Sequence, residues 1–196
     1  IGGFKVDPKD PDPYNIYNSP DWWPLIELAE QETDLIRMVG PERTLAAGNC
    51  RDEFVSEEIY LRDGSRYARQ TMRIAGRTLT ALTRRDPEVS TTWTVEHLLK
   101  DIDDVKAFLQ LPDAFFDYTY SAARLIQEEQ ALGEAGIVMV DTGDPLVYAA
   151  SLFSTADYTV FALTEPKLFH QLLQKHTRLC YTMAEEVSRQ FPGHLW

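Results

Sequence analysis

Two aspartates follow a continuous apolar run at residues 137–140. A run of this kind, preceded by Gly136, is typical of a strand buried on both faces of a parallel sheet. Ligands of parallel α/β folds bind where such strands end. Asp141 could therefore position a cationic or hydroxyl group, or serve in acid–base catalysis. Asp144, followed by Pro145, also has the simpler interpretation of a helix N-cap.

Eight arginines lie between residues 51 and 85 of an otherwise acidic chain. Guanidinium groups can bind carboxylates or phosphates through paired hydrogen bonds. A solvated strand face balanced by nearby acids is the simpler interpretation. Arg84 lies where the chain leaves this segment, which makes it a candidate for substrate binding. Trp93 could shape a pocket, although packing alone would also explain it.

The remaining reactive side chains show no recognisable catalytic or metal-binding spacing. The four histidines do not form a ligand set, and the sequence contains no HExxH, GxSxG or P-loop motif. Cys50 could be a nucleophile in a loop, whereas Cys180 fits a packing role in a helix. Two cysteines are too few for a disulfide framework, which favours a reducing, cytoplasmic environment.

Periodicity and turn residues predict a mixed α/β chain. Residues 6–24 are rich in Asp-Pro pairs and predict an ordered loop, and residues 33–39 fit a short strand or a helix end. Three β-prone runs at 54–61, 66–74 and 78–83, separated by glycine-containing turns, predict an antiparallel meander. The other predicted elements are a helix after Asp21 to about Glu32, an extended stretch at 91–95, a strand at 137–140, and helices at 101–109, 117–132, 145–153, 156–163 and 165–190.

Length and charge limit the classes of function. The chain has 196 residues and a net charge of −12, which repels phosphate backbones and anionic lipids, so neither nucleic acid nor a membrane is expected as a partner. It contains no apolar run of membrane-spanning length and no signal peptide. No repeat or linker divides it, which predicts one domain over 1–196 with a meander insertion at about 53–85. The missing initiator Met suggests an excised or processed piece.

Three segments resemble the uroporphyrinogen decarboxylase superfamily: residues 91–101, 136–145 and 162–170. The resemblance extends from about Tyr14 to Trp196 and is strongest to an uncharacterised bacterial branch related to cobalamin-dependent methyltransferases. It implies a TIM-type (β/α)₈ barrel, which usually needs about 250 residues or more. The chain would then be an incomplete α/β barrel, its N-terminal and middle part, with the three-stranded meander as an excursion. Residues 136–153 would form one barrel strand and the loop and helix at its catalytic mouth.

Two departures from the family pattern weigh against porphyrinogen decarboxylation. Residues 2–8 stand where the family carries an arginine motif that binds the substrate carboxylates, and they contain no arginine. The family's substrate-facing tyrosine aligns near Ser151, with Tyr148 one helical turn away. The zinc ligands of the methyltransferase relatives, a His-x-Cys pair and a later Cys, would lie beyond Trp196.

The resemblance implies an enzyme of corrinoid-linked methyl transfer to or from a small molecule. Asp141 would be catalytic, and Asp144, Tyr148, Arg84 and Trp93 would bind substrate. No cofactor is expected within this chain, whereas zinc and a corrinoid-carrying protein or second subunit are expected for a full-length protein. One alternative is a lyase of tetrapyrrole metabolism that decarboxylates uroporphyrinogen or a related carboxylated substrate, with the arginines of the meander in place of the missing motif. Another is a non-enzymatic binding or interaction module.

Overall fold

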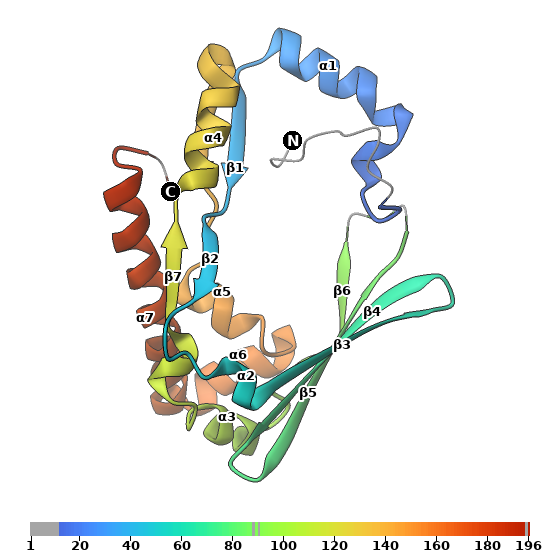
Figure 1. The fold of residues 1–196 in the computed structure, drawn as a ribbon. Coiled ribbons are helices and arrows are strands. Elements are labelled where there is room, and N and C mark those ends of the chain that lie inside the picture. Colours follow the sequence, from blue (N-terminus) through green and yellow to red (C-terminus); the bar gives the residue numbers. More distant parts are fainter. Residues whose placement is uncertain (1–11, 88, 90, 195) are drawn as a thin grey trace.

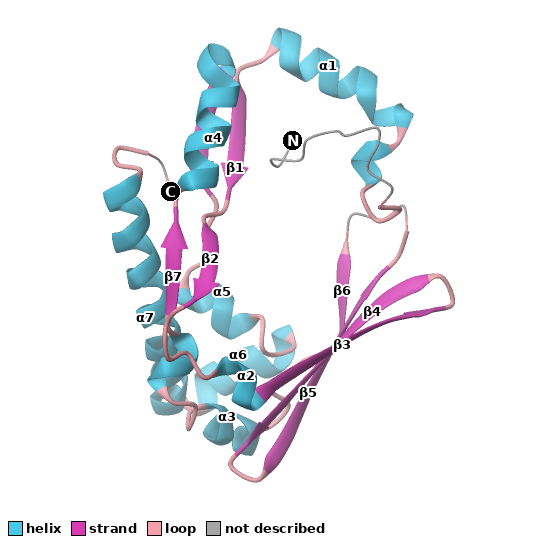
Figure 2. Ribbon diagram, in the orientation of Figure 1, coloured by secondary structure: helices cyan, strands magenta, loops and turns pink. Residues whose placement is uncertain are grey.

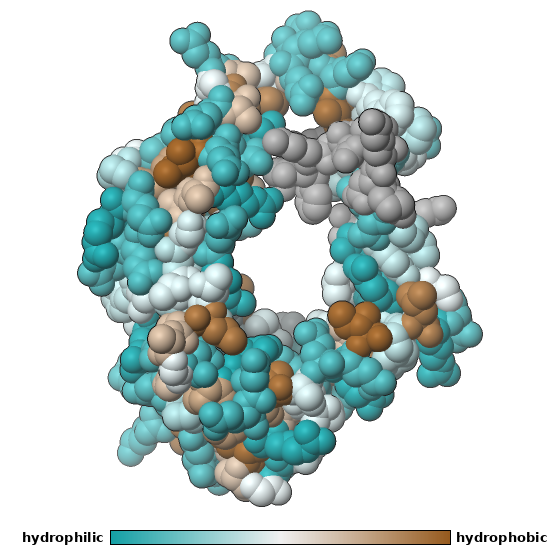
Figure 3. All heavy atoms as spheres, viewed as in Figure 1, coloured by the Kyte–Doolittle hydropathy of each residue, from teal (hydrophilic) through white to brown (hydrophobic). Residues whose placement is uncertain are grey.

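A computed structural model describes residues 12–87, 89, 91–194 and 196 of the chain. The described atoms leave an open space between strands β1 and β2 on one side and the sheet β3–β6 on the other (Figures 1 and 3). In chain order the elements are the short turns η1 (Ile16–Asn18) and η2 (Pro20–Trp22), α1 (Trp23–Glu32), β1 (Leu35–Val39), β2 (Glu42–Leu45), α2 (Arg51–Phe54), β3 (Val55–Arg62), β4 (Ser65–Ile74), β5 (Arg77–Arg85), β6 (Thr92–Glu96), α3 (Ile102–Phe108), η3 (Asp113–Phe116), β7 (Tyr118–Ser121), α4 (Ala123–Leu132), η4 (Gly133–Ala135), β8 (Gly136–Val140), α5 (Pro145–Ala150), α6 (Thr155–Thr164) and α7 (Pro166–Gln190).

The predicted meander is confirmed and extended by one strand. Strands β3, β4, β5 and β6 form an antiparallel sheet in that order, and the predicted extended stretch at 91–95 becomes the edge strand β6. The β3–β4 turn places Asp63 and Gly64 at positive φ, as two-residue hairpin turns require. The antiparallel sheet therefore extends to Glu96. Figure 2 shows helices α2, α3 and α6 beside one end of this sheet, where Met72 and Leu79 are buried.

Strands β1 and β8 form a two-stranded parallel sheet. Their register pairs Leu35 with Gly136 and Val39 with Val140. Gly136 is required by this pairing, because a Cβ there would lie 1.9 Å from the carbonyl oxygen of Leu35. The predicted strand at 137–140 is confirmed, but its burial on both faces is not. Val140 is buried, whereas Ile137 on the other face is half exposed.

The third sheet corrects the prediction of a helix over 117–132. Residues Tyr118–Ser121 form strand β7, which pairs antiparallel with β2, and helix α4 begins only at Ala123. The C-terminal helix α7 holds this strand from the side. Tyr120 donates its backbone N–H to Glu186 at 2.7 Å and accepts a hydrogen bond from Gln190 at 2.9 Å. A strand of four residues carries too little periodicity to be distinguished from the start of a helix.

The expected TIM-type barrel is contradicted by the strand pairing. Among the described residues only β1 and β8 pair in parallel, and β2, β7 and the four strands of the meander all pair antiparallel. A (β/α)₈ barrel needs consecutive parallel strands linked by crossover helices. Here the chain leaves β2 for the meander and returns through β7 in the antiparallel direction. The described chain is therefore a mixed α/β fold with three small, separate sheets.

Helix α7 joins two apolar cores. Its buried stripe begins at Leu172, which packs with the meander and helices α3, α5 and α6, and ends at Val187, which packs with β1, β7, β8 and α4. Within the described residues, no helix combines the length and apolar character that a membrane span requires. Further helix predictions are confirmed, including α3, where the Asp101 side chain caps the helix by accepting from the N–H of Asp104. Helix α1 forms as predicted, but without the expected Asp21 cap. The predicted loop at residues 6–11 lies outside the described residues.

Candidate active site at the carboxyl end of strand β8

The loop after β8 is fixed by backbone contacts to both neighbouring elements. The Asp141 N–H donates to the Val39 carbonyl at 2.9 Å and so continues the β1·β8 ladder by one residue. The Thr142 hydroxyl donates to the Gly143 carbonyl at 3.1 Å and lies 3.4 Å from the Met183 sulfur on α7. The loop is thus held between the end of β1 and the C-terminal helix.

The predicted cap at Asp144 is confirmed. Its carboxylate accepts a hydrogen bond from the N–H of Val147 at 2.8 Å, and Pro145 occupies the first turn of α5. The side chain remains exposed beyond this bond. Capping fixes where α5 begins, and it thereby fixes the position of Tyr148 one turn later.

Tyr148 lies between the loop and helix α7. Its ring packs so closely on Gly143 that a Cβ at that position would lie 3.0 Å from the ring carbon Cζ. On its other side the ring stacks on His176, with centroids 6.0 Å apart and planes 26° from parallel. The glycine of the Asp-Thr-Gly-Asp segment is therefore needed to admit the tyrosine ring.

His176 is the most unusual side chain at this end of the molecule. It is 7% exposed and is also in contact with the rings of Phe108 and Phe116, at centroid distances of 6.2 and 5.9 Å. Its Nε2 is buried with no hydrogen-bond partner. Burial lowers the pKa of His176 to about 4, so the imidazole is neutral at neutral pH.

Two further polar groups complete the arrangement. The Cys180 thiol, one turn after His176 on α7, donates to the Gly143 carbonyl at 3.8 Å, and burial followed by the charge of Asp144 raises its pKa. The Tyr120 hydroxyl on β7 is buried without a partner, and burial raises its pKa to about 12. Tyr148 and Cys180 also contribute to the rise in the pKa of Tyr120, so their side chains lie close to the Tyr120 hydroxyl. We call the set the strand-end cluster: Asp141, Thr142, Gly143, Asp144, Tyr120, Tyr148, His176 and Cys180.

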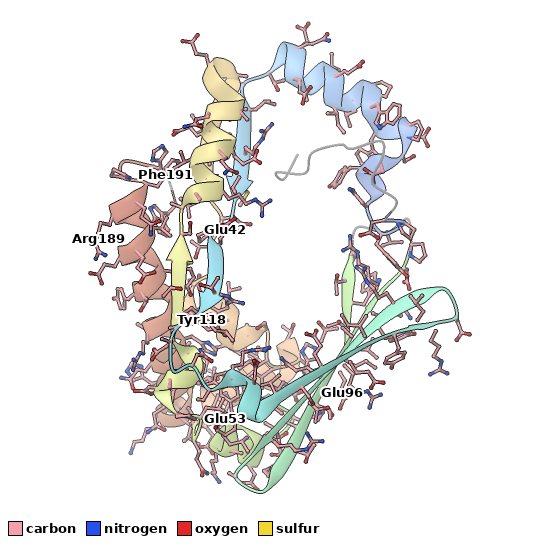
Figure 4. The ribbon with its side chains drawn as sticks, in the orientation of Figure 1. Glu42, Glu53, Glu96, Tyr118, Arg189 and Phe191 are labelled. Atoms are coloured by element: carbon pink, nitrogen blue, oxygen red, sulfur yellow. The ribbon has the colours of Figure 1, made fainter. Side chains whose placement is uncertain are left out.

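The strand-end cluster brings together three of the five predicted site residues: Asp141, Asp144 and Tyr148. Arg84 and Trp93 lie elsewhere, opposite each other on strands β5 and β6, where Arg84 forms an ion pair with Asp86 at 3.1 Å. In Figure 4, Glu96 of β6 and Tyr118 of β7 lie well apart, which shows how far the ends of these two strands are separated in that view.

Sequence reasoning missed His176, Cys180 and Tyr120. His176 and Cys180 are four residues apart and share one face of a helix, a signal that the sequence does contain. Comparing histidines only with one another, as in the pair His170 and His176, overlooks it. Tyr120 was not considered as a site residue because the sequence placed it in a predicted helix rather than in strand β7.

The donor set of the cluster does not fit a zinc ion. Among the described residues, no three His, Cys, Asp or Glu side chains come together as a metal-ligand group. His176 is enclosed by the rings of Phe108 and Phe116, and its Nε2 is buried. The cluster can instead present the exposed carboxylates of Asp141 and Asp144 to a ligand, beside the partly exposed Tyr148 and Cys180, whereas Tyr120 and His176 are buried.

Comparison with known proteins identifies no relative: no family model, curated protein or solved structure matches the chain.

Proposed function

We propose that the chain belongs to an enzyme related to the uroporphyrinogen decarboxylase superfamily, and that its reaction is corrinoid-linked methyl transfer to or from a small molecule. The observation that carries the proposal is the strand-end cluster, in which Asp141 directly follows a parallel strand and Tyr148, on the helix after the same loop, stacks on His176. Segment 136–145, which resembles that superfamily, contributes strand β8 and the loop of this cluster. Converging polar groups at such a strand end are the usual setting of small-molecule sites.

The charges of the cluster favour a neutral or cationic substrate over a polycarboxylate. Asp141 and Asp144 are both exposed, and within the described residues no lysine or arginine side chain forms an ion pair with either of them. The raised pKa values keep the Tyr120 hydroxyl and the Cys180 thiol uncharged at neutral pH. A methylated amine would therefore be attracted to the cluster, whereas the carboxylates of a porphyrinogen would be repelled.

Three arginines of the meander are bound to groups of the chain itself. Arg77 binds Asp104 and Asp101, and Arg84 binds Asp86. Arg85 donates to the backbone carbonyl of Tyr14 at 2.6 Å. These guanidinium groups are occupied within their own part of the fold, which weighs against the decarboxylase alternative.

Each residue of the cluster has a distinct role in the proposed reaction. Asp141 would hold a cationic or hydroxyl group of the substrate, and Tyr148 would donate a hydrogen bond to it. Asp144 acts indirectly, because its cap sets the start of α5 and hence the position of Tyr148. A corrinoid carried by a partner protein would supply the centre that accepts or donates the methyl group. Gly143 and His176 keep the Tyr148 ring in place.

Calorimetric titration tests the substrate class. We expect tetramethylammonium to bind the chain, and Asp141→Asn to weaken that binding at least about tenfold, because it removes the charge and keeps the shape. Asp63→Asn, at the tip of the β3–β4 turn, is the matched control and should bind as wild type does. Binding of uroporphyrin with no binding of tetramethylammonium would favour the decarboxylase instead.

A turnover assay tests the reaction. Asp141→Ala should abolish methyl transfer between methylcobalamin and a methylamine or thiol acceptor, while leaving the melting temperature near that of wild type. Wild-type turnover in this variant contradicts the assignment of Asp141. Decarboxylation of uroporphyrinogen without added metal supports the alternative reaction, and binding of neither ligand supports a non-enzymatic module.

A further inference from the structure

Strand β3 is an unpaired sheet edge. Within the described residues it pairs only with β4, and its outer side has no strand against it. Figure 1 shows the hairpin of β3 and β4 projecting away from the helices. An exposed edge of eight residues is a template for pairing with another chain, and proteins usually protect such an edge.

The side chains of this edge are unusually apolar for a free surface. Ile59 is 65% exposed and Leu61 is 71% exposed, and both lie on the face that carries Val55 into the core at the other end of the strand. Tyr60 points to the opposite face, where its ring stacks on Tyr67 of β4 at 5.4 Å. Ile59 and Leu61 therefore lie on the part of β3 that extends beyond the helices.

The sequence of β3 is complementary to itself in one antiparallel register. When Tyr60 lies opposite Tyr60 of a second copy, Ile59 lies opposite Leu61 of that copy on one face. On the other face Glu58 lies opposite Arg62. Two-fold symmetry repeats both pairs, which gives two apolar contacts and two ion pairs across residues 58–62, the part of β3 that pairs with itself; Glu57 faces Asp63 of the adjoining turn. Among the described residues, the Arg62 guanidinium forms an ion pair with the adjacent Asp63 at 3.4 Å, a highly exposed pair that contributes little.

We propose that two copies of this chain associate through strand β3, antiparallel and centred on Tyr60. The two meanders then form one continuous eight-stranded sheet, in which the Tyr60–Tyr67 stacks of both copies meet at the two-fold axis. Within the described residues, Tyr14 lies against Arg66 on β4 and donates to the Gly64 carbonyl at the tip, so it contacts β4 and the turn rather than β3. The association is independent of the function proposed for the strand-end cluster.

Light scattering coupled to size-exclusion chromatography measures the association directly. We expect a mass of twice 22.4 kDa for the wild-type chain. Ile59→Lys combined with Leu61→Lys should give a monomer with an unchanged circular dichroism spectrum, because both side chains are exposed. Leu163→Lys, at a residue that is 77% exposed on α6, is the matched control and should remain dimeric. A monomeric wild type, or a dimer that survives the double substitution, overturns the proposal.

Charge exchange tests the register. Glu58→Arg and Arg62→Glu each place two like-charged pairs across the axis and should weaken dimerisation about tenfold or more. An equimolar mixture of the two variants should form a heterodimer, because every facing pair is then of opposite charge. Glu58→Arg also places a like charge opposite Arg69 within the chain, so this variant and the double variant Glu58→Arg/Arg62→Glu both carry Arg69→Glu, which restores that pair. Failure of both the mixture and the double variant to dimerise overturns the register.

Cysteine cross-linking locates the axis. Tyr60→Cys brings two thiols together at the two-fold axis, and a mild oxidant should convert the chain to a covalent dimer. Tyr67→Cys, one strand further from the axis, is the control and should not cross-link faster than the wild-type cysteines Cys50 and Cys180. Equal cross-linking of both variants contradicts an axis at Tyr60.

Discussion

Tyr148 and His176 stack with their ring centroids 6.0 Å apart, and this contact joins the loop after β8 to the C-terminal helix. The two residues are 28 positions apart in the chain, on α5 and α7. The stack places a neutral imidazole, rather than a charged one, behind the tyrosine that faces the candidate site. The chemistry of the strand-end cluster therefore depends on the protonation state of one buried histidine.

The folded state should lose stability as the pH is lowered, because His176 is buried in its neutral form. Burial lowers its pKa from 6.5 to about 4, so the unfolded chain binds more protons than the folded chain between these values. The contribution is fully present above pH 6.5 and is lost as pH falls toward 4, by about 3 kcal/mol at most. Urea unfolding of His176→Phe should show a smaller difference between pH 7 and pH 4.5 than wild type. The exposed His170→Phe should retain the wild-type difference, and an unchanged pH dependence in His176→Phe would contradict the expectation.

Gly143→Ala should destabilise the loop, whereas Gly40→Ala should not. The new Cβ at Gly143 would lie 3.0 Å from the Tyr148 ring, which must move away from its stack on His176. At Gly40 the new Cβ would lie 3.5 Å from the Asp141 carbonyl, an ordinary contact. We expect a loss of about 1 kcal/mol for the first change and a neutral or slightly stabilising effect for the second. Thermal unfolding measures both, and equal melting temperatures would show that the ring adjusts freely.

Arg77→Met should be strongly destabilising. Arg77 donates two hydrogen bonds to Asp104 at 2.7 and 2.9 Å, and Asp104 is buried. Removing the guanidinium leaves the buried Asp104 carboxylate without its cation, which we expect to lower the free energy of unfolding by clearly more than the loss of an exposed pair does. Arg189→Met removes an exposed pair with Glu185 and should cost less than about 0.5 kcal/mol. Similar losses in the two variants would mean that the buried pair contributes no more than a surface pair.

Tyr120→Phe and Tyr14→Phe should change stability in opposite directions. Both tyrosines are buried, but the Tyr120 hydroxyl has no partner, whereas the Tyr14 hydroxyl donates to the Gly64 carbonyl at 3.3 Å. Removing the unpartnered hydroxyl should be neutral or stabilising by up to about 1 kcal/mol, and removing the bonded one should cost about 1 kcal/mol. Thermal unfolding of both variants measures these changes. A marked loss of stability in Tyr120→Phe would show that the Tyr120 hydroxyl has a partner.

Several elements could be predicted from the sequence because their signals are local. The glycine-containing turns specified the hairpins of β3, β4 and β5, since only a few residue types tolerate the positive φ values of such turns. Asp101 and Asp144 marked the starts of α3 and α5, because a cap needs only the backbone N–H groups that follow it. The grouping of Asp141, Asp144 and Tyr148 was also local, as one strand, loop and helix carry all three.

The predictions that the structure contradicts concern the pairing of segments that are distant in the sequence. The apolar run at 137–140 suits a strand covered on both faces. Within the described residues, the apolar cluster that includes α4 covers the face of Val138 and Val140, whereas Ile137 on the other face is left half exposed. The short segment Tyr118–Ser121 resembles a helix start until β2 pairs with it. The expected barrel was wrong for the same reason, because strand direction depends on which segments meet.

The sequence by itself determined the turns, the helix caps, the apolar stripe of α7 and the candidate aspartates, because each depends on residues within a few positions of one another. Only the tertiary structure decided that the strands divide into three small sheets, and that Arg84 and Trp93 lie apart from the strand-end cluster. It also decided that His176 is neutral, since its pKa reflects burial among Phe108, Phe116 and Tyr148, which reach it from three different segments. Contacts of this kind form only when those segments pack together.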